Sequence, residues 1–388
     1  MDVRIEPSKL SGTIKAIPSK SYAQRILIAS ALADKPTEIM LDYISEDVWS
    51  AINALISFGA EIKIETDKLI VTPAKKSNQI NIDCGESGTV ARLLLPIVTA
   101  ICDSGTITGQ GSLMNRPFET LCDVLEKHGC CFDTKKLPIT FNNKIKPGNY
   151  EIRGDESSQY ISGLLFALPL LDGDSKIILT TPLESSGYVD MTIETLKNFG
   201  IESKYNCEIM GRQIYKSPGK INVEGDWSNA AFWLAAGIEV TNLDNNSLQK
   251  DRQILTIKNQ HEIDAAEIPD LVPILAVVAA TKKSAVRIFN VKRLRLKESD
   301  RIQSTAKMIE SLGGNVKIDD TEIIIYGAGI LRGGIVDGSN DHRIVMSAAI
   351  ASCFCEQTVT ITGAQAVDKT YPNFFEDFNK MGGKSYVV

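Results

Sequence analysis

The sequence predicts an α/β fold of two domains, each assembled from three copies of one repeat of helices and strands. Three observations predict it. The chain has 388 residues, beyond the length at which one hydrophobic core stops growing. Capped helices recur about every 70 residues, and a helix-ending glycine recurs at the same spacing. The composition, 43% hydrophobic and 23% charged, is ordinary for a globular protein.

Six helices are expected, each beginning at a short polar group and continuing through small and apolar residues. Polar side chains favour such starts because they accept hydrogen bonds from the free N–H groups of the first turn. The expected apolar segments are 26–33, 93–102, 161–171, 230–236, 271–280 and 344–352. Their polar markers are Ser19, Ser87, Ser157, Ser228, Asp270 and Asn340, at spacings of 68, 70, 71, 42 and 70 residues.

A glycine that ends an amphipathic stretch is the second marker of the repeat. It recurs at Gly59, Gly129, Gly200, Gly313 and Gly382, at spacings of 70, 71, 113 and 69 residues. The spacing of 113 residues equals one full period of 71 plus the short spacing of 42 found between Ser228 and Asp270. The fourth repeat is therefore expected to lack its second helix. Alternating residues follow the glycines, as in 60–64 and 314–318, which is typical of a half-buried strand.

The two ends of the chain are expected to complete one repeat together. The last repeat, from Asn340 to Val388, is too short for the period, while residues 1–18 precede the first marker. We therefore expect one domain over residues 19–224 and a second over residues 1–18 plus 225–388. A solenoid is the alternative for a periodic chain, but mixed repeats of this length exceed the usual solenoid repeat.

Charge and composition exclude several classes of protein. The net charge of -6 argues against a nucleic-acid coat, which needs a basic face. The first residues lack the basic and apolar regions of a secretory signal, and the longest apolar runs are shorter than the roughly 20 residues that span a bilayer. A cytoplasmic protein is expected. The eight cysteines show no zinc-binding spacing, and we expect buried reduced thiols.

Cations gather at the expected helix starts, where free N–H groups already favour anions. They are Lys20, Arg25, Arg92, Arg116, Lys297, Arg301, His342, Arg343 and Lys369. This combination predicts a site for a small polyanion. Taken singly, each feature also fits a plain structural role. Residues 297–301 could be a solvated helix start, and Asp270 could be only a cap near a proline turn.

Nine segments, in order, carry a specific resemblance. They are 18–21 with Arg25, 85–89 with Arg92, 115–117, 157–159, 224–226, 268–270, 295–301, 340–343 and 368–372. On these segments the chain resembles the enolpyruvyl transferase family over nearly its whole length. It is most similar to the members that act on shikimate 3-phosphate.

The resemblance implies an inside-out α/β barrel fold, with two domains of three βαβαββ repeats each and the active site in the cleft between them. It also implies the reaction. The enolpyruvyl group of phosphoenolpyruvate would pass to the 5-hydroxyl of shikimate 3-phosphate with release of phosphate, in the shikimate pathway to chorismate and aromatic amino acids. No metal or organic cofactor is expected.

The family's site residues carry over position by position. The resemblance implies that shikimate 3-phosphate is held by Lys20, Ser21, Arg25, Ser157, Ser158, Gln159, Ser185, Tyr188, Asp270 and Lys297. It implies that phosphoenolpyruvate is held by Lys20, Gly88, Arg116, Gln159, Arg301, Arg343 and Lys369. Asp270 would accept the proton of the attacking hydroxyl, Glu298 with Lys20 would deliver a proton to the methylene carbon, and His342 would steady the developing charge.

Two positions depart from the family pattern. Glu86 stands where asparagine is common, which puts a carboxylate beside the expected phosphoenolpyruvate site, and Arg293 stands where an amide is common. The expected partners are the two substrates, with glyphosate as an inhibitor. We expect a monomer that binds neither nucleic acid nor membrane.

Two rival functions remain at this point. The sister enzyme that acts on UDP-N-acetylglucosamine carries a cysteine in the loop before the arginine matched by Arg116, and residues 109–115 contain none. A nucleic-acid-binding module would use 292–297 as an alternating basic strand. The acidic total charge and the absence of interleaved aromatic residues argue against it.

Overall fold

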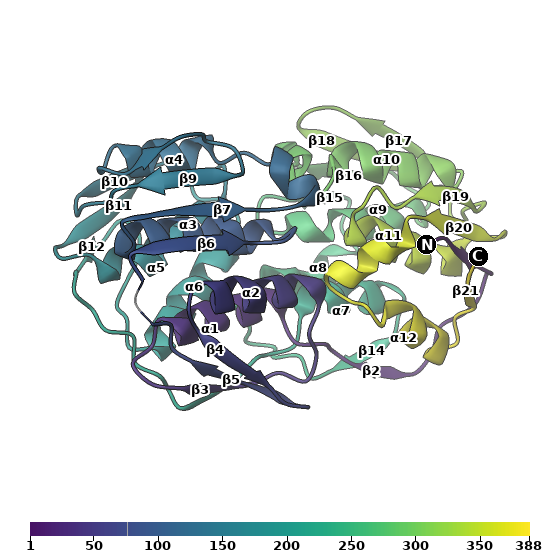
Figure 1. The fold of residues 1–388 in the computed structure, drawn as a ribbon. Coiled ribbons are helices and arrows are strands. Elements are labelled where there is room, and N and C mark those ends of the chain that lie inside the picture. The colour runs from purple at the N-terminus through teal and green to yellow at the C-terminus, as the bar shows by residue number, and fades with distance from the viewer. Residues whose placement is uncertain (76) are drawn as a thin grey trace. The chain divides into compact units, whose positions relative to one another are not determined.

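The computed structural model describes residues 1–75 and 77–388. The chain divides into two compact units. Unit 2 is Lys20–Val223, and unit 1 joins Met1–Ser19 to Glu224–Val388. The expected boundaries at 18/19 and 224/225 differ from these by one residue at each crossing. Figure 1 shows the elements of both units.

Unit 2 holds the first three repeats. The first consists of α1 (Lys20–Ala31), β3 (Thr37–Met40), α2 (Glu46–Ser57), β4 (Glu61–Ile64) and β5 (Lys68–Thr72). The second consists of β6 (Gln79–Asp83), α3 (Gly88–Ile101), β7 (Ser104–Thr108), η1 (Gly111–Asn115), α4 (Glu119–Glu126), β8 (Cys131–Phe132) and β9 (Ile139–Asn142). The third consists of β10 (Asn149–Ile152), α5 (Ser158–Ala167), η2 (Leu168–Leu170), β11 (Ser175–Leu179), α6 (Ser186–Asn198), β12 (Glu208–Ile209) and β13 (Lys220–Asn222).

The sheets of unit 2 show how its chain closes on itself. In the part that the structure describes, the strand orders are β13-β3-β5-β4, β6-β7-β9-β8 and β10-β11-β12. β6 runs parallel to β7, and β9 runs antiparallel to both β7 and β8. The first sheet has the same pattern, but its first strand is β13, the last strand of the unit, which pairs in parallel with β3. The two ends of unit 2 therefore share one sheet.

Unit 1 begins with β1 (Val3–Ile5) and β2 (Thr13–Lys15). The fourth repeat consists of α7 (Trp227–Ala235), β14 (Glu239–Thr241), η3 (Lys250–Gln253) and α8 (Ile254–Ile257). The fifth consists of β15 (Glu262–Asp264), η4 (Pro269–Leu271), α9 (Val272–Ala280), β16 (Val286–Phe289), η5 (Lys292–Leu296), α10 (Arg301–Ser311), β17 (Asn315–Ile318) and β18 (Glu322–Tyr326). The sixth consists of β19 (Gly334–Asp337), α11 (His342–Ala351), η6 (Ser352–Phe354), β20 (Val359–Thr362), η7 (Ala364–Lys369), α12 (Phe374–Lys380) and β21 (Ser385–Val387).

The N-terminal segment serves two repeats of unit 1, whereas the sequence predicted that it would complete only the last one. β1 does complete the sixth repeat, lying antiparallel between β20 and β21. β2 instead pairs in parallel with β14 of the fourth repeat. The prediction was therefore wrong for β2. The physical reason is that, in the described residues, the shortened fourth repeat supplies only one strand, β14, to a two-stranded sheet. Pairing with β2 covers an edge of β14 that would otherwise expose unpaired N–H and C=O groups.

The glycines that were predicted to end helices adopt the expected conformation. Gly59, Gly129, Gly200, Gly313 and Gly382 have φ angles of 105°, 105°, 71°, 84° and 98°. They follow α2, α4, α6, α10 and α12. Because a side chain disfavours this left-handed region, glycine is the residue that lets each helix stop and the chain turn into the next strand.

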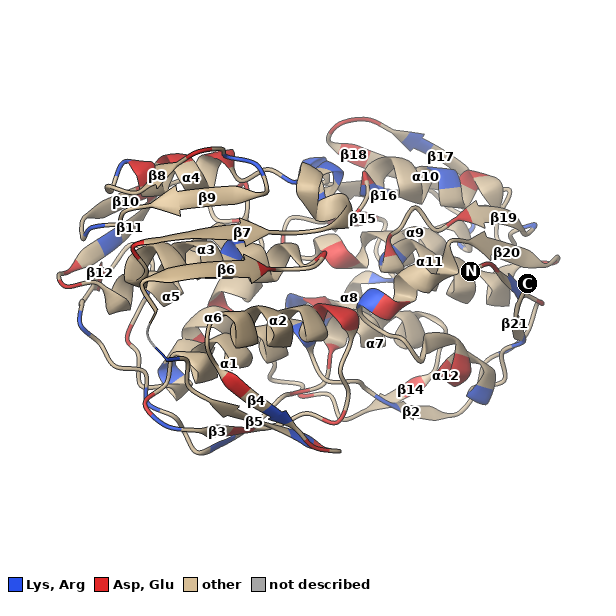
Figure 2. Cartoon of the chain, viewed as in Figure 1, with Lys and Arg blue, Asp and Glu red and all other residues tan. Residues whose placement is uncertain are grey.

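Long apolar helices form the core of each unit. α3 packs against α5 in unit 2, and α9 packs against α11 in unit 1. α5 and α9 contain no charged residue and are tan throughout in Figure 2. A helix that is apolar on all sides must be buried, and each fully buried Leu or Ile side chain contributes about 1.5–3 kcal/mol. This burial fixes the direction of the helices, and with it the position of their first turns.

Three local predictions need correction. The side chain that caps α7 is Asp226, which accepts from the Asn229 N–H at 2.8 Å, and not Ser228. Of the basic run at 292–297, residues 292–296 form η5 rather than a strand. Of the cysteines, Cys131 and Cys207 are exposed and Cys353 is half-buried, so only the other thiols match the expected burial.

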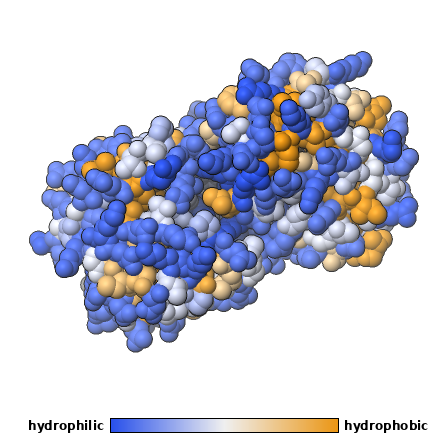
Figure 3. Space-filling model, turned by 90° about the horizontal axis from the view of Figure 1, so that it is seen from above, coloured by the Kyte–Doolittle hydropathy of each residue, from blue (hydrophilic) through white to orange (hydrophobic). Residues whose placement is uncertain are grey.

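The face of the molecule seen from above is mainly polar (Figure 3). The face shown in Figure 3 is covered mainly by hydrophilic residues, with hydrophobic residues in scattered patches. None of the helices in the described part of the chain has the length and hydropathy needed to cross a membrane.

Candidate active site

The first turns of α1 and α3 are joined by hydrogen bonds in unit 2. Lys20 begins α1, and its Nζ lies 2.6 Å from Oδ2 of Asp47. One turn later, Gln24 Nε2 donates to the Asp47 carbonyl and to Ser87 Oγ, each at 3.0 Å. Ser87 is the N-cap of α3. The predicted residues Lys20 and Gly88 therefore stand on two helix starts that are fixed to one another.

The starts of α3 and α5 are joined in the same way. Arg92 Nη1 donates to Gln159 Oε1 at 2.9 Å, and Gln159 Nε2 donates to Thr89 Oγ1 at 2.9 Å. The Arg116 guanidinium lies against Gly88, because a Cβ added to this glycine would be 2.6 Å from Arg116 Nη1. The structure thus brings together Gly88, Arg116 and Gln159, which the sequence predicted as ligands of phosphoenolpyruvate.

Arg25 connects α1 to α6 through neutral partners. Its Nε donates to Thr192 Oγ1 at 2.7 Å, Nη1 to the Ser21 carbonyl at 2.8 Å and Nη2 to the Tyr188 carbonyl at 3.0 Å. Desolvation of this buried cation lowers the pKa of Arg25 to about 10, with a smaller opposing effect of Tyr188 and Tyr22. The structure therefore brings together the predicted shikimate 3-phosphate ligands Ser21, Arg25 and Tyr188.

The other three predicted serine ligands, Ser157, Ser158 and Ser185, also lie at helix starts. Ser157 is the N-cap residue of α5, and Ser158 is the first residue of that helix and is buried. Ser185 is the N-cap residue of α6, with a left-handed φ of 54°. Helix starts favour anions in general, because the N–H groups of the first turn point along the helix axis toward the ligand.

In unit 1 the Arg301 guanidinium is surrounded by carboxylates. Its Nε donates to Asp341 Oδ2 at 2.7 Å, Nη1 to Asp270 Oδ1 at 2.6 Å and Nη2 to Glu298 Oε2 at 2.7 Å. Burial disfavours the charge, but Asp341, Glu298 and Asp270 outweigh it and raise the pKa of Arg301 well above its usual range. The solvated helix start proposed as an alternative for 297–301 is therefore wrong, because Arg301 is 1% exposed.

Cations surround the Asp270 carboxylate. Besides Arg301, Lys297 Nζ lies 3.5 Å from Oδ1 and Arg343 Nη2 lies 3.9 Å from Oδ2. Desolvation alone would favour the neutral acid, but Lys297, Arg343 and Arg301 outweigh it and hold the pKa of Asp270 well below its usual range. A capping role for Asp270 is not needed, since its oxygens face these cations.

The other predicted residues of unit 1 lie at the start of α11 or beside it. Asp341 caps this helix by accepting from the Arg343 N–H at 3.0 Å. His342 is the first residue of the helix, and its Nδ1 lies 3.8 Å from Asp341 Oδ1. Lys369 Nζ donates to the Asn340 carbonyl at 3.0 Å. Asp270, Glu298, Lys297, Arg301, His342, Arg343 and Lys369 thus form one cluster in unit 1.

Sequence reasoning did not single out three carboxylates of these clusters. Asp47 pairs with Lys20, Asp341 binds Arg301, and Asp251 accepts a hydrogen bond from the Ser228 hydroxyl. Asp341 belongs to a motif that carries the resemblance, so its place beside His342 was a usable signal. Nothing local distinguishes Asp47 or Asp251 from surface carboxylates.

The two departures from the family pattern have definite surroundings. The Glu86 carboxylate lies over Gly111, at the start of η1, where any side chain would collide with it. Arg293 donates from Nη2 to the Ala266 carbonyl at 2.7 Å. In the same run, Arg295 is bound to Asp300 and Asp320, at 2.6 and 2.7 Å. These contacts, and the helical form of the run, argue against a nucleic-acid surface.

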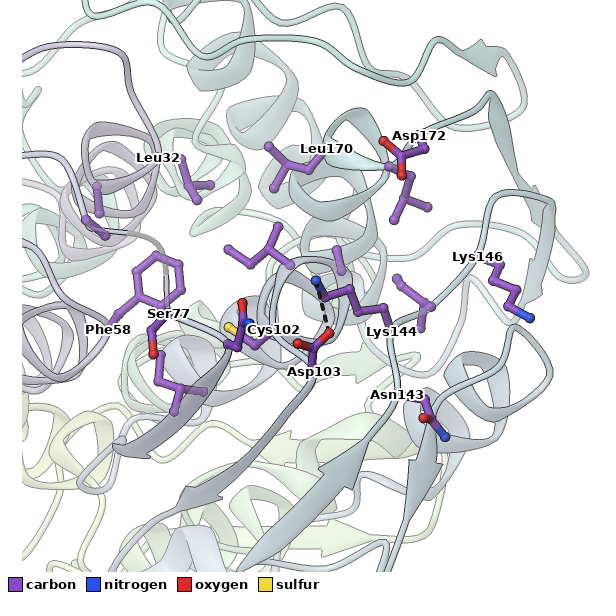
Figure 4. A pocket seen from close by; sticks show the side chains of 18 of the residues that line it. Leu32, Phe58, Ser77, Cys102, Asp103, Asn143, Lys144, Lys146, Leu170 and Asp172 are labelled. Carbon is purple, nitrogen blue, oxygen red and sulfur yellow. Dashed lines mark ion pairs between the residues drawn. The ribbon is translucent and has the colours of Figure 1, made fainter.

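A separate cavity of about 1200 Å³ lies at the far ends of the unit 2 helices. It is lined by residues at the C-terminal ends of α1, α3 and η2, such as Leu32, Cys102 and Leu170, and by the ion pair of Lys144 with Asp103 at 3.2 Å (Figure 4). None of the predicted site residues lines it. The candidate site is therefore at the opposite ends of these helices.

Comparison with known proteins identifies the family. The sequence model of the family named EPSP synthase (3-phosphoshikimate 1-carboxyvinyltransferase) matches residues 5–260 and 235–378 of this chain. The chain belongs to the EPSP synthase family. Among similar curated proteins, the 3-phosphoshikimate 1-carboxyvinyltransferase of Clostridium novyi is 40% identical over 98% of each chain, and that of Clostridioides difficile is 37% identical over 98% of each chain.

Solved structures show the same fold. EPSP synthase from Acinetobacter baumannii superposes with a TM-score of 0.82 at 23% identity, covering 100% of each chain. The enolpyruvyl transferase NikO from Streptomyces tendae gives a TM-score of 0.78 at 15% identity, covering 99% of this chain and 98% of that one. The expected enolpyruvyl transferase fold is confirmed.

Membership of the EPSP synthase family also confirms the expected enzyme class. The chain is a transferase of the 3-phosphoshikimate 1-carboxyvinyltransferase type, EC 2.5.1.19, in the shikimate pathway of aromatic amino-acid biosynthesis. The geometry described above is what this class of reaction can use: helix starts with cations in unit 2, and a carboxylate among cations in unit 1.

Proposed function

We propose that the two clusters act together on phosphoenolpyruvate and shikimate 3-phosphate. The unit 2 cluster would bind shikimate 3-phosphate through Ser21, Arg25, Ser157, Ser158, Gln159, Ser185 and Tyr188. Phosphoenolpyruvate would bind to Lys20, Gly88, Arg116, Gln159, Arg343 and Lys369. The observation that carries the proposal is the Asp270 carboxylate among Lys297, Arg301 and Arg343.

Substrate binding would convert Asp270 into a base. In the structure its cations keep the pKa of Asp270 low, which makes the carboxylate a weak proton acceptor. An anionic substrate competes for those cations. When phosphoenolpyruvate attracts Arg343 and shikimate 3-phosphate attracts Lys297, the pKa of Asp270 rises toward the range of a working base. The base would thus be formed only when both substrates are present.

The chemistry has two balanced steps. In the addition, Asp270 takes the proton of the 5-hydroxyl, the oxygen bonds to C2 of phosphoenolpyruvate, and Glu298 with Lys20 delivers a proton to the methylene carbon. In the elimination, that carbon returns the proton to Glu298 and Lys20, the double bond forms again, the C2–O bond to phosphate breaks, and the leaving phosphate takes the proton held by Asp270. His342, at the α11 start, would stabilise the charge that develops.

Arg301 would act mainly by holding the carboxylates. Its guanidinium group is bound to Asp341, Asp270 and Glu298. A guanidinium has five N–H donors, so this arrangement leaves little capacity for a substrate anion. We therefore assign Arg301 the positioning of Asp270 and Glu298, in place of the direct phosphoenolpyruvate contact expected from the resemblance.

Phosphate release from purified protein tests the proposal. Phosphoenolpyruvate would be supplied with either shikimate 3-phosphate or UDP-N-acetylglucosamine. Phosphate should appear with the first acceptor and not with the second. The reverse result would overturn the assignment of the acceptor.

Small-angle scattering tests whether the two clusters act together. Ligand groups contributed by two units joined at two crossings make closure on the substrate a natural motion. The radius of gyration should fall when shikimate 3-phosphate is added. An unchanged radius would contradict closure. The same measurement should give the mass of a monomer, the oligomeric state that we propose. We also propose that the enzyme is cytoplasmic.

A further inference from the structure

The shortened fourth repeat contributes no predicted ligand, yet it contacts the site cluster of unit 1. The Ser228 carbonyl, in the first turn of α7, accepts from Arg343 Nη1 at 2.9 Å. One turn further along the same helix, the Phe232 ring lies 5.8 Å from Arg343 Cζ. The Arg343 side chain is therefore placed by one face of α7, because residues four apart in a helix lie on the same side.

Asp251 fixes this turn of α7 from behind. It lies in η3, is 5% exposed, and accepts a hydrogen bond from the Ser228 hydroxyl through Oδ2. The same serine thus connects Asp251, through its hydroxyl, with Arg343, through its carbonyl. A second contact joins this turn to the neighbourhood of Lys369, since Thr370 Oγ1 donates to Asn229 Oδ1 at 3.5 Å.

We propose that Asp251 is a positioning residue for phosphoenolpyruvate, which acts through Ser228 to hold the Arg343 guanidinium in place beside Asp270. The inference rests on the proposed function, in which Arg343 binds this substrate. It assigns a purpose to the fourth repeat: its helix start and the turn that contains Asp251 support a cation contributed by the sixth repeat.

The electrostatics of Asp251 agree with a buried supporting role. Desolvation is the main cause that raises the pKa of Asp251 to about 7, and the nearby charges of Asp270 and Asp226 act in the same direction. The Ser228 hydroxyl and the charge of Arg343 oppose this shift. A buried carboxyl with so little exposure is costly unless it is bound. Ser228 and the charge of Arg343 supply that compensation.

Steady-state kinetics of Asp251→Ala and Ser228→Ala test the proposal. Each change removes one side of the hydrogen bond, and hydrogen bonds that involve charged groups are worth about tenfold or more in an equilibrium constant. The KM for phosphoenolpyruvate should rise roughly tenfold, while the KM for shikimate 3-phosphate stays within a factor of about two. Asp251→Asn keeps an acceptor for the serine and should restore most of the affinity.

The matched control is Asp244→Asn, an exposed carboxylate in the loop before η3 whose side chain accepts from the Asn246 N–H. It should leave both KM values unchanged. A double variant with Arg343→Met provides the decisive comparison. If Asp251 acts through Arg343, adding Asp251→Ala to Arg343→Met should not raise the KM for phosphoenolpyruvate further.

The possible outcomes separate this inference from the proposed function. Failure of the parent to use either substrate would overturn the proposed function. With an active parent, three results would overturn the role of Asp251: an unchanged KM in both alanine variants, an equal rise for both substrates, or additive effects in the double variant. Ser228→Ala leaves the Asp251 carboxyl in place and puts alanine, a good helix former, into α7. It therefore tests the same hydrogen bond if Asp251→Ala does not fold.

Discussion

Arg25 in unit 2 and Arg301 in unit 1 are buried to the same extent, each 1% exposed, but their charges are compensated in opposite ways. Arg25 donates to a hydroxyl and two carbonyls, and its pKa is lowered to about 10. Arg301 donates to three carboxylates, and its pKa is raised. Neutral partners fix a cation without cancelling its charge, whereas carboxylates cancel it.

The comparison extends to Arg92 but not to Lys20, which pairs with the Asp47 carboxylate at 2.6 Å. Arg92 of unit 2 also donates to neutral oxygens, those of Gln159 and the Pro117 backbone, at 2.9 and 3.3 Å. In unit 1, carboxylates alternate with cations around Asp270. The lesson is a difference between the partners of the two buried arginines: Arg25 of unit 2 keeps its charge among hydroxyl and carbonyl oxygens, whereas the charge of Arg301 in unit 1 is cancelled by carboxylates.

The largest expected effect comes from Asp270→Asn, which tests the assignment of acid-base chemistry to unit 1. Turnover should fall by roughly 10²–10⁴-fold, the usual contribution of a general base, because the amide keeps the shape but cannot take the proton. Substrate affinities from equilibrium binding should remain near those of the parent. Asp264→Asn, an exposed carboxylate on β15, is the control. Activity of Asp270→Asn within a few-fold of the parent would refute the role of Asp270.

The next effect compares the two arginines directly. Arg301→Met leaves buried carboxylates without their cation and should lower the free energy of unfolding by about 3–5 kcal/mol. Arg25→Met leaves only neutral acceptors and should cost about 1–3 kcal/mol. Urea unfolding of both variants measures the difference. Equal losses would show that the kind of partner does not matter at these two positions.

A smaller effect is expected from Gly88→Ala, which probes the anion site of unit 2. The added methyl group would lie 2.6 Å from Arg116 Nη1, so this flexible guanidinium must shift. Such crowding typically costs about 1–3 kcal/mol. We expect glyphosate to compete with phosphoenolpyruvate in the parent and the variant to weaken glyphosate more than the substrate, because the inhibitor is the longer molecule.

Inhibition should be measured on parent and variant over a range of phosphoenolpyruvate concentrations, since the nearby Glu86 already puts a carboxylate near this loop. Inhibition that does not change as phosphoenolpyruvate rises would show that the two molecules do not share a site. The placement of Gly88 beside the substrate would then be wrong.

A final effect is a pH dependence of stability that distinguishes two carboxyls of unit 1. The unfolded pKa of aspartate is about 3.9, and burial, with Asp270 adding, raises the folded pKa of Asp251 to about 7. The stability that its proton contributes is therefore lost as pH rises from about 4 to 7. Relative to the parent, Asp251→Asn should gain unfolding free energy over this interval and remain level above it.

Asp270 should show the opposite sign. Its folded pKa lies well below the unfolded value because Lys297, Arg343 and Arg301 outweigh desolvation, so its contribution is present above about pH 4 and is lost as pH falls through the folded pKa. Urea unfolding of Asp251→Asn and Asp270→Asn at a series of pH values measures both slopes. Differences from the parent that do not vary with pH would contradict the two shifts.

Much of the fold could be predicted from the sequence because the signals are local. The positive φ at Gly59 and Gly313 follows from the need to end a helix, and the helix start after Ser87 follows from a cap three residues from its donor. Their regular spacing revealed the repeat and the shortened fourth copy. The resemblance supplied the remaining residues of the candidate site.

The sequence by itself determined the repeat, the helix starts and which residue types stand there, since caps and periodicity depend on neighbours within a few positions. Only the tertiary structure decided where β2 and β13 pair, which carboxylates surround Arg301, and that Asp251 supports Ser228. The partners of Arg301 at Asp270 and Asp341 lie 31 and 40 residues away. Such contacts depend on how the buried helices pack, because packing alone brings side chains so distant in sequence within hydrogen-bonding distance.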